Sequence, residues 1–179
     1  MTLPIQQPTI ISKRLQLRPF SDDDAVETSR LAGDQKIIAT TFSIPEQYTE
    51  SKALKWIKSH RDKWQNRDEI VYGICVHNSA QIMGAVSLFD IQDEAAELGY
   101  WIGVPYWNNG YATEAASTLI DYAFEYFNFN FIHARYLKSN PASGVVLNKI
   151  GMSLTKEDKA KDRYGEWVDY CYCGLHKST

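Results

Sequence analysis

Hydrophobic and polar residues alternate, fully or in part, along six short stretches of the chain, which is the spacing of half-buried β-strands. The stretches are residues 15–19, 70–77, 81–89, 95–102, 131–137 and 167–175. Asn78 and Ser79 form a turn signal between the second and third stretches, and residues 90–93 connect the third to the fourth. Strands joined by such short connections pair antiparallel, so the middle of the chain predicts an antiparallel meander.

Apolar residues recur at helical spacing in two longer stretches, residues 53–64 and 112–127, which predict amphipathic helices. A shorter helix is expected to start at Ser21, because Asp24 stands three residues later in the position of a capping box. Gly33 is expected to end that helix.

The order of the elements predicts how the sheet continues after the meander. The helix over residues 112–127 separates the fourth strand from the fifth, and a strand–helix–strand crossover makes its two strands parallel. A last short helix is expected over residues 143–150, closed by Gly151. Strands and helices therefore mix along the whole chain, which is typical of an α/β protein in the broad sense that includes α+β folds.

Two further segments predict loops. Residues 37–48 carry a proline and little periodicity, which indicates a loop or broken helix beside the mouth of a site. Residues 156–163 carry charges of both signs and predict a solvated loop. No internal repeat or interdomain linker interrupts the chain, so one domain is expected over residues 1–179, with its core at about residues 12–175.

Composition narrows the class of protein. The chain is 44% hydrophobic and 23% charged, which is typical of a globular domain. Its net charge is −3, from 19 basic and 22 acidic residues, so neither nucleic acid nor membrane is expected as a partner. The N-terminus lacks the pattern of a signal peptide, and we expect a cytoplasmic protein. Cys75, Cys171 and Cys173 show no metal-type spacing and are expected to be reduced thiols.

The stretch from Glu97 to Ala115 carries the strongest chemical signal. It predicts a strand, then a turn of small residues, then the first turn of a helix, whose free backbone N–H groups and dipole favour a bound phosphate. No lysine stands in the Walker position, so the turn is not that of a P-loop NTPase. Asn109 and Gly110 would also suit a hairpin turn, but the helical spacing that follows favours the phosphate interpretation.

Four segments together resemble the Gcn5-related N-acetyltransferase (GNAT) superfamily, in particular its ribosomal-protein-serine/alanine N-terminal acetyltransferase (RimJ/RimL-like) branch. They are Leu-Gln-Leu-Arg-Pro-Phe at residues 15–20, Glu-Leu-Gly-Tyr-Trp-Ile at 97–102, Trp-Asn-Asn-Gly-Tyr-Ala-Thr-Glu-Ala at 107–115, and Asn-Pro-Ala-Ser at 140–143 continuing to 149–152. The resemblance implies the GNAT acyl-CoA N-acyltransferase fold, a twisted, mostly antiparallel mixed sheet with a splayed central parallel pair and flanking helices.

The resemblance also implies the phosphate ligand, which would be the diphosphate of acetyl-CoA. In the family pattern Trp107 replaces a Gln or Arg, while Gly110 and Ala112 fill the small-residue positions. Ile102 and Val104 would pair with the pantetheine arm as an added strand does, and Asn140 would bond to the same arm. The cofactor-binding residues implied in this way are Ile102, Gly103, Val104, Trp107, Asn108, Asn109, Gly110, Tyr111, Ala112, Thr113, Asn140 and Ser143.

Two residues are implied as catalytic. Glu97 would act as general base on the amine, although a lone strand glutamate can also simply face solvent; Glu94 is the lesser candidate. Many relatives protonate the departing thiolate with a helix tyrosine, but Leu147 occupies that position here. Ser143 is the remaining candidate for bonding the sulfur, and its alternative role is that of a helix N-cap.

The implied function is acetyl transfer from acetyl-CoA to a primary amine, most directly the α-amino group of a ribosomal protein that begins with Ser or Ala. A small-molecule acceptor (an antibiotic, polyamine or amino acid), a non-catalytic acyl-CoA sensor and an interaction module without CoA remain as alternatives. The four histidines show no metal-ligand spacing and are expected at the surface or in strands, so no metal is expected. Dimers are common among relatives, which makes a homodimer possible here.

Overall fold

The computed structural model describes residues 6–41 and 43–178. Its elements, in chain order, are β1 (Ile10–Ile11), β2 (Leu15–Arg18), the 3-10 turn η1 (Asp22–Asp24), α1 (Ala25–Ala32), α2 (Gln35–Ile38), α3 (Glu50–Asn66), β3 (Ile70–Val76), β4 (Gly84–Gln92), β5 (Ala95–Ile102), the 3-10 turn η2 (Val104–Tyr106), α4 (Tyr111–Tyr126), β6 (Phe131–Leu137), α5 (Pro141–Lys149), β7 (Ser153–Lys161) and β8 (Trp167–His176). Within the described residues, no helix is long and apolar enough to cross a membrane.

The strands form one eight-stranded sheet in the order β1-β2-β3-β4-β5-β6-β8-β7. Neighbouring strands pair antiparallel except β5 and β6, which are parallel. The predicted meander of β3, β4 and β5 and the predicted crossover through α4 are both confirmed. A mostly antiparallel sheet with one central parallel pair is the arrangement that the resemblance implied.

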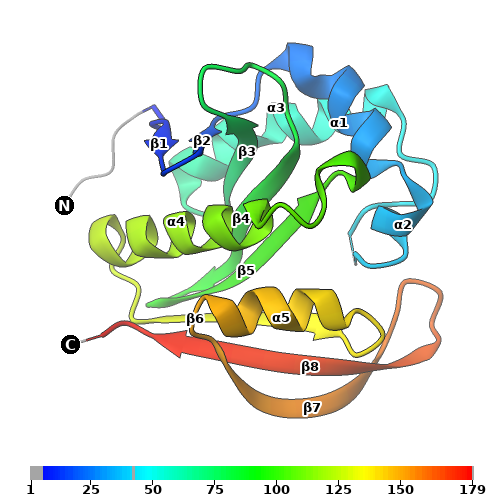
Figure 1. Cartoon of the computed structure of the whole chain (residues 1–179), viewed down its shortest axis with the longest axis vertical. Coiled ribbons are helices and arrows are strands. Elements are labelled where there is room, and N and C mark those ends of the chain that lie inside the picture. Colours follow the sequence, from blue (N-terminus) through cyan, green and yellow to red (C-terminus); the bar gives the residue numbers. More distant parts are fainter. Residues whose placement is uncertain (1–5, 42, 179) are drawn as a thin grey trace.

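Helices cover both faces of the sheet (Figure 1). On one face, the buried even-numbered residues of β5, such as Leu98, share a core with Leu119 and other residues of α4 and with Leu147 of α5. On the other face, Ala53 and Ile57 of α3 pack with Ala25 of α1 in a separate cluster. Because side chains alternate along a strand, odd-numbered residues of β5 point to this second face.

The central parallel pair is short and then opens. Strands β5 and β6 are in register at three positions only, and the last of these joins Glu97 to His133. Beyond it β5 continues with β4 to Ile102, whereas β6 continues with β8 to Leu137. The sheet is thereby divided into two halves, and a V-shaped opening separates them.

Three predictions of local structure are wrong. Residues 90–93 were expected to connect two strands, but β4 continues to Gln92. Residues 156–163 were expected to form a solvated loop, but β7 occupies Ser153–Lys161 and pairs with β8. As an edge strand it is exposed along almost its whole length, so it carries charges in place of the apolar alternation that marks a half-buried strand. Helix α5 starts at Pro141, with Asn140 as its N-cap, so the expected start and the N-cap role at Ser143 are also wrong.

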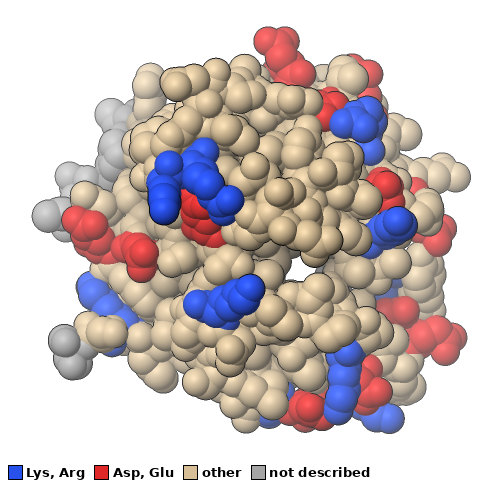
Figure 2. Space-filling model, in the orientation of Figure 1, with Lys and Arg blue, Asp and Glu red and all other residues tan. Residues whose placement is uncertain are grey.

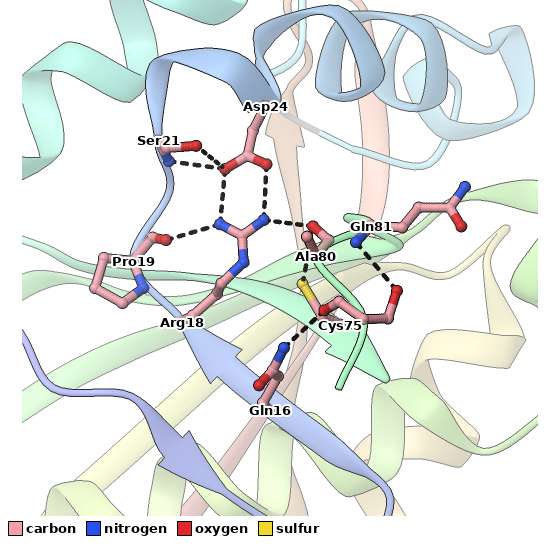
Figure 3. A network of polar contacts seen from close by, with 9 residues as sticks. Gln16, Arg18, Pro19, Ser21, Asp24, Cys75, Ala80 and Gln81 are labelled. Atoms are coloured by element: carbon pink, nitrogen blue, oxygen red, sulfur yellow. Dashed lines mark hydrogen bonds and ion pairs between the residues drawn. The ribbon is translucent and has the colours of Figure 1, made fainter. Parts of the chain in front are cut away.

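A polar network ties β2 to the segment that follows β3 (Figure 3). The guanidinium of Arg18 forms two hydrogen bonds to the carboxylate of Asp24, at 2.8 and 2.7 Å, and a third to the carbonyl of Ala80. Asp24 also accepts a bond from the backbone N–H of Ser21, which confirms the capping box. Burial acts to raise the pKa of Asp24, but the bonds from Arg18 and Ser21 outweigh it and lower the pKa overall.

Candidate active site

The turn before α4 has the geometry of an anion site. Gly110 is the N-cap residue, with φ of 76°, and no side chain caps the helix there. Asn108 is also left-handed, with φ of 62°. The amide of Asn109 donates to the carbonyls of Tyr106 and Trp107, at 3.2 and 2.9 Å, which holds the turn closed. A helix follows the turn, so the hairpin alternative is wrong.

Arg14, from the start of β2, also belongs to this turn, and the sequence analysis missed it. Its side chain donates to Glu114 on α4, at 2.6 Å, and to the carbonyl of Asn109, at 3.0 Å. Glu114 accepts a further bond from Ser12, at 2.8 Å. Burial acts to raise the pKa of Glu114, but these bonds outweigh it and lower the pKa overall. Arg14 therefore brings a fixed cation to a loop in which Trp107 replaces the usual Gln or Arg.

An open pocket of about 620 Å³ lies at this end of α4. Lys13, Arg14 and Lys149 line it together with Gly110 and Thr113. Figure 2 shows basic side chains on both sides of the hollow between α4 and α5, and an opening between the end of β5 and α5. The three cations and the uncapped helix N-terminus fit a diphosphate, and the volume fits a nucleotide-sized ligand.

The end of β5 already has several internal bonds. The carbonyl of Ile102 accepts a bond from the indole of Trp107, at 2.6 Å, and the N–H of Gly103 donates to Met83, at 2.8 Å. Val104 begins the η2 turn and does not extend the strand. The Trp107 bond occupies the Ile102 carbonyl and so competes with the strand-like pairing expected there, whereas the Gly103 bond continues the pairing of β5 with β4. The edge of β5 that faces the opening lies further back, after Glu97.

A pair of hydroxyl groups spans the opening on the face covered by α4 and α5. The phenol of Tyr100, on β5, lies 2.8 Å from the Oγ atom of Ser143, on α5, and donates to the carbonyl of the same residue at 3.2 Å. Burial raises the pKa of Tyr100 to about 12. Leu147, which stands where relatives carry a tyrosine, is buried in the core. Tyr100 was not predicted, because the resemblance implies a tyrosine on the helix that became α5, whereas Tyr100 lies on β5.

Glu97 lies where the two halves of the sheet separate. It is 7% exposed, so the alternative of a solvent-facing strand glutamate is wrong. Burial raises its pKa, and Arg135 and His133 oppose that rise. Glu94, the lesser candidate, is exposed and accepts a bond from Asn128, at 3.0 Å, in the connection before β6.

Glu97 and the Tyr100–Ser143 pair reach the opening from opposite faces of the sheet. Residues 97 and 100 have opposite parity on β5, and Glu97 shares its face with residues of β6 that have the parity of His133. Asn140, the N-cap of α5, uses no side-chain bond to cap the helix.

The Glu97 face is bridged by a clasp, formed by Arg163 and Tyr164 in the turn between β7 and β8. Arg163 donates to the carbonyls of Ile38, at 3.1 Å, and of Thr41 and Ile44. Tyr164 donates to the carboxylate of Glu46, at 2.6 Å. The clasp joins the segment after α2 to the far half of the sheet, as the neighbouring positions of α2 and the β7–β8 turn in Figure 1 show.

One histidine lies in a different environment from the one predicted. His60 was expected at the surface or in a strand, but it is buried on α3. Its ring packs edge-on against Trp56 and Phe20. His60 therefore belongs to the buried face of the amphipathic helix, which the sequence analysis described by its apolar residues alone. No group of three or more His, Cys, Asp or Glu residues within 6–41 and 43–178 could hold a metal ion.

Comparison with known proteins agrees with this geometry. The profile of the Acetyltransferase (GNAT) domain matches residues 14–153. The chain is 28% identical over 167 residues to the "Probable N-acetyltransferase YjcK" of Bacillus subtilis, with 88% of this chain and 91% of that protein covered.

Two solved structures have the same fold. The microcin C7 self-immunity acetyltransferase MccE, in complex with acetyl-CoA and AMP, has a TM-score of 0.82 at 22% identity, with 93% of this chain and 94% of that chain covered. RimL, the ribosomal L7/L12 α-N-protein acetyltransferase in complex with coenzyme A, has a TM-score of 0.82 at 18% identity, with 94% and 98% covered. On the extent of the domain match and the shared fold, the chain belongs to the GNAT family of acetyl-CoA-dependent N-acetyltransferases.

Proposed function

We propose that the protein transfers the acetyl group of acetyl-CoA to the α-amino group of a protein N-terminus, with a ribosomal protein beginning with Ser or Ala as the first candidate. The likeness to RimL in fold supports this acceptor class, as do the sequence segments shared with that branch. The observation that carries the proposal is the separation of β5 from β6 directly after Glu97, because it gives two substrates access to one point from opposite faces.

On the α4–α5 face, Gly110, Thr113, Arg14 and Lys149 hold the diphosphate of acetyl-CoA, which supplies the acetyl group as a thioester. On the other face, Glu97 accepts a proton from the acceptor ammonium. Its raised pKa suits a base that works near neutral pH. The neutral amine then attacks the thioester carbon through the opening. Backbone N–H groups on the free edge of β5 polarise the carbonyl oxygen.

In the proposed mechanism, Ser143 bonds the departing sulfur. Its hydroxyl lies 2.8 Å from the phenol of Tyr100, so a proton given up by Ser143 can be replaced from Tyr100. The acetyl group ends on the amine nitrogen, and the electron pair of the broken C–S bond stays on sulfur, which takes a proton from the hydroxyl pair to give free CoA. The nitrogen loses its second proton as the C–S bond breaks. That proton replaces, through water, the one that the hydroxyl pair gave up, and Glu97 releases the first proton to solvent. Much of the remaining acceleration comes from holding the amine and the thioester together.

The test measures acetyl-CoA-dependent thiol release and the mass of the product with peptides that begin with Ser or Ala. Copies of the same peptides, already acetylated at the α-amino group and carrying an internal lysine, separate α- from ε-acetylation. We expect acetylation of the free α-amino group alone and loss of turnover in Glu97→Gln. Glu94→Gln is the matched control, because Glu94 is an exposed carboxylate just before β5 and should leave turnover unchanged. Acetyl-CoA binding without transfer to any amine would refute the proposal and favour a sensor.

A second candidate is acetylation of a small-molecule amine. The clasp favours it, because Arg163 and Tyr164 join the two halves of the sheet on the face that carries Glu97 and so restrict the size of an acceptor. The likeness in fold to MccE, a self-immunity acetyltransferase, is compatible with it. In the same assay, product formation on polyamines or amino-sugar antibiotics, with none on peptides, would select this candidate.

A further inference from the structure

Arg135 lies against the candidate base, and the mechanism described above gives it no role. Its Nε atom is 3.0 Å from an oxygen of Glu97. Arg135 stands on β6 two residues after His133, the last residue in register with β5, so it occupies the same face as Glu97. The guanidinium therefore reaches back across the opening at the point where the strands begin to separate.

The titratable groups on and beside the Glu97 face come from three strands, β4, β6 and β8. Asp90 of β4 is a like charge, while His133 and Arg135 of β6 are its basic neighbours. Tyr172 of β8 stands directly opposite Arg135 in the sheet, and Tyr170, on the same face of β8, is buried. Arg135 is thus the cation in ion-pair contact with Glu97, while His133 is a second basic group and Asp90 an acidic group that act on the same carboxylate.

Burial alone would disable a base at this position. A carboxylate withdrawn from water becomes harder to ionise, and a carboxylic acid cannot accept the proton of an ammonium group. A cation at ion-pair distance reverses much of that effect, whereas removing the cation leaves a buried charge without compensation. The raised pKa of Glu97, which burial causes and Arg135 limits, agrees with this balance.

We propose that Arg135 is a positioning residue that keeps Glu97 ionised and holds its carboxylate at the opening between β5 and β6, so that Glu97 accepts protons at neutral pH. The inference rests on the proposed function, because it assigns a partner to the proposed base. Arginine suits the task, since its guanidinium stays charged at every working pH and its planar fork matches a carboxylate.

The experiment compares Arg135→Met and Arg135→Lys with the parent protein in two measurements. The first is kcat/KM from pH 5.5 to 9 at saturating acetyl-CoA with the best amine found. The second is a carbon-13 NMR titration of glutamate side-chain carboxyl groups, in which the Glu97 signal is the one missing from Glu97→Gln. Arg30→Met is the matched control, because Arg30 pairs with Glu27 on α1 at 2.6 Å and does not contact Glu97.

We expect the Glu97 titration and the acid limb of kcat/KM to move together to higher pH in Arg135→Met. The ratio of kcat/KM at pH 6.5 to that at pH 9 should fall about tenfold, the effect of an opposite charge lost at ion-pair distance. Arg135→Lys keeps the charge, so its profile should lie between the two, and it provides the test if Arg135→Met does not fold. Arg30→Met should leave both measurements unchanged.

An unmoved Glu97 signal in Arg135→Met would overturn the proposal, as would an equal movement in Arg30→Met. If the NMR titration of Glu97 moves in Arg135→Met but the acid limb of kcat/KM does not, the Arg135–Glu97 ion pair does not control proton acceptance, and the proposal is overturned. Failure of the proposed function is distinguishable, because it appears as absent turnover in every variant, while the NMR titration still shows whether Arg135 keeps Glu97 ionised.

Discussion

The buried histidine on α3 predicts how the stability of the protein depends on pH. His60 is 6% exposed, and neither ring nitrogen has a hydrogen-bond partner among the described residues. Its ring lies edge-on to Trp56, with 4.3 Å between centroids. Burial, with a smaller contribution from Lys63, lowers the pKa of His60 to about 3. The imidazole is therefore neutral in the folded protein over the working pH range.

The magnitude follows from the difference between folded and unfolded states. An unfolded histidine titrates near pH 6.5, so below that pH the unfolded chain binds a proton that the folded chain rejects. Stability is therefore lost as the pH falls from about 6.5 towards the folded value. Between pH 8 and pH 5, this one residue costs about 2 kcal/mol of unfolding free energy. With a urea slope of about 2 kcal/mol per molar, His60 should lower the urea concentration at the unfolding midpoint by about 1 M between pH 8 and pH 5.

The assay is urea denaturation at pH 8 and pH 5, followed by tryptophan fluorescence, for the parent protein and His60→Leu. At pH 8 the variant should differ little, because removal of two unpaired nitrogens offsets the loss of ring contacts. At pH 5 it should retain about 2 kcal/mol more than the parent. His176→Leu, which removes an exposed imidazole at the end of β8, is the matched control. Equal losses between the two pH values in parent and His60→Leu would refute the reasoning.

Three further changes test the site. Gly110→Val should weaken CoA binding by on the order of tenfold in calorimetry, because φ is 76° and the residue lines the pocket; Gly151→Val, at φ 88°, bears the same strain and should bind normally. Tyr100→Phe should lower kcat by on the order of tenfold with little change in the KM for acetyl-CoA, since one hydrogen bond to Ser143 is lost; unchanged kcat would remove Tyr100 from the mechanism. Arg163→Gln should raise kcat/KM for bulky amines relative to small ones, and an unchanged ratio would show that the clasp does not select acceptors.

The turn before α4, where we propose that the diphosphate binds, could be predicted because its parts are local in sequence. A turn of small residues followed by helical spacing is enough to identify the N-terminus of α4, and Gly110 lies where that pattern requires it. The contribution of Arg14 could not be predicted in the same way. It reaches Glu114 from 100 residues away, and only the pairing of the first strands places it beside the turn.

The edge strand and the hydroxyl pair show two other limits. Hydrophobic alternation reports burial on one face, and β7 is exposed on both faces, so the pattern that marks the other strands is absent from it. Tyr100 of β5 contacts Ser143 of α5 across the opening, a relation that depends on how far the parallel strands β5 and β6 stay together. The sequence of neither strand alone shows at which residue β5 and β6 stop pairing.

The separation of the proposed acetyl-CoA side from the proposed acceptor side affects which amine the protein can acetylate. In the proposed function, acetyl-CoA binds at the turn before α4. The proposed acceptor side lies between the segment after α2 and the β7–β8 turn, which are more than 100 residues apart and meet through Arg163 and Tyr164. A change in either segment can alter the acceptor without affecting the diphosphate pocket on the opposite face. Proteins of this fold can therefore keep one cofactor site and differ in their amines, and the clasp is the part of this chain at which that difference is best sought.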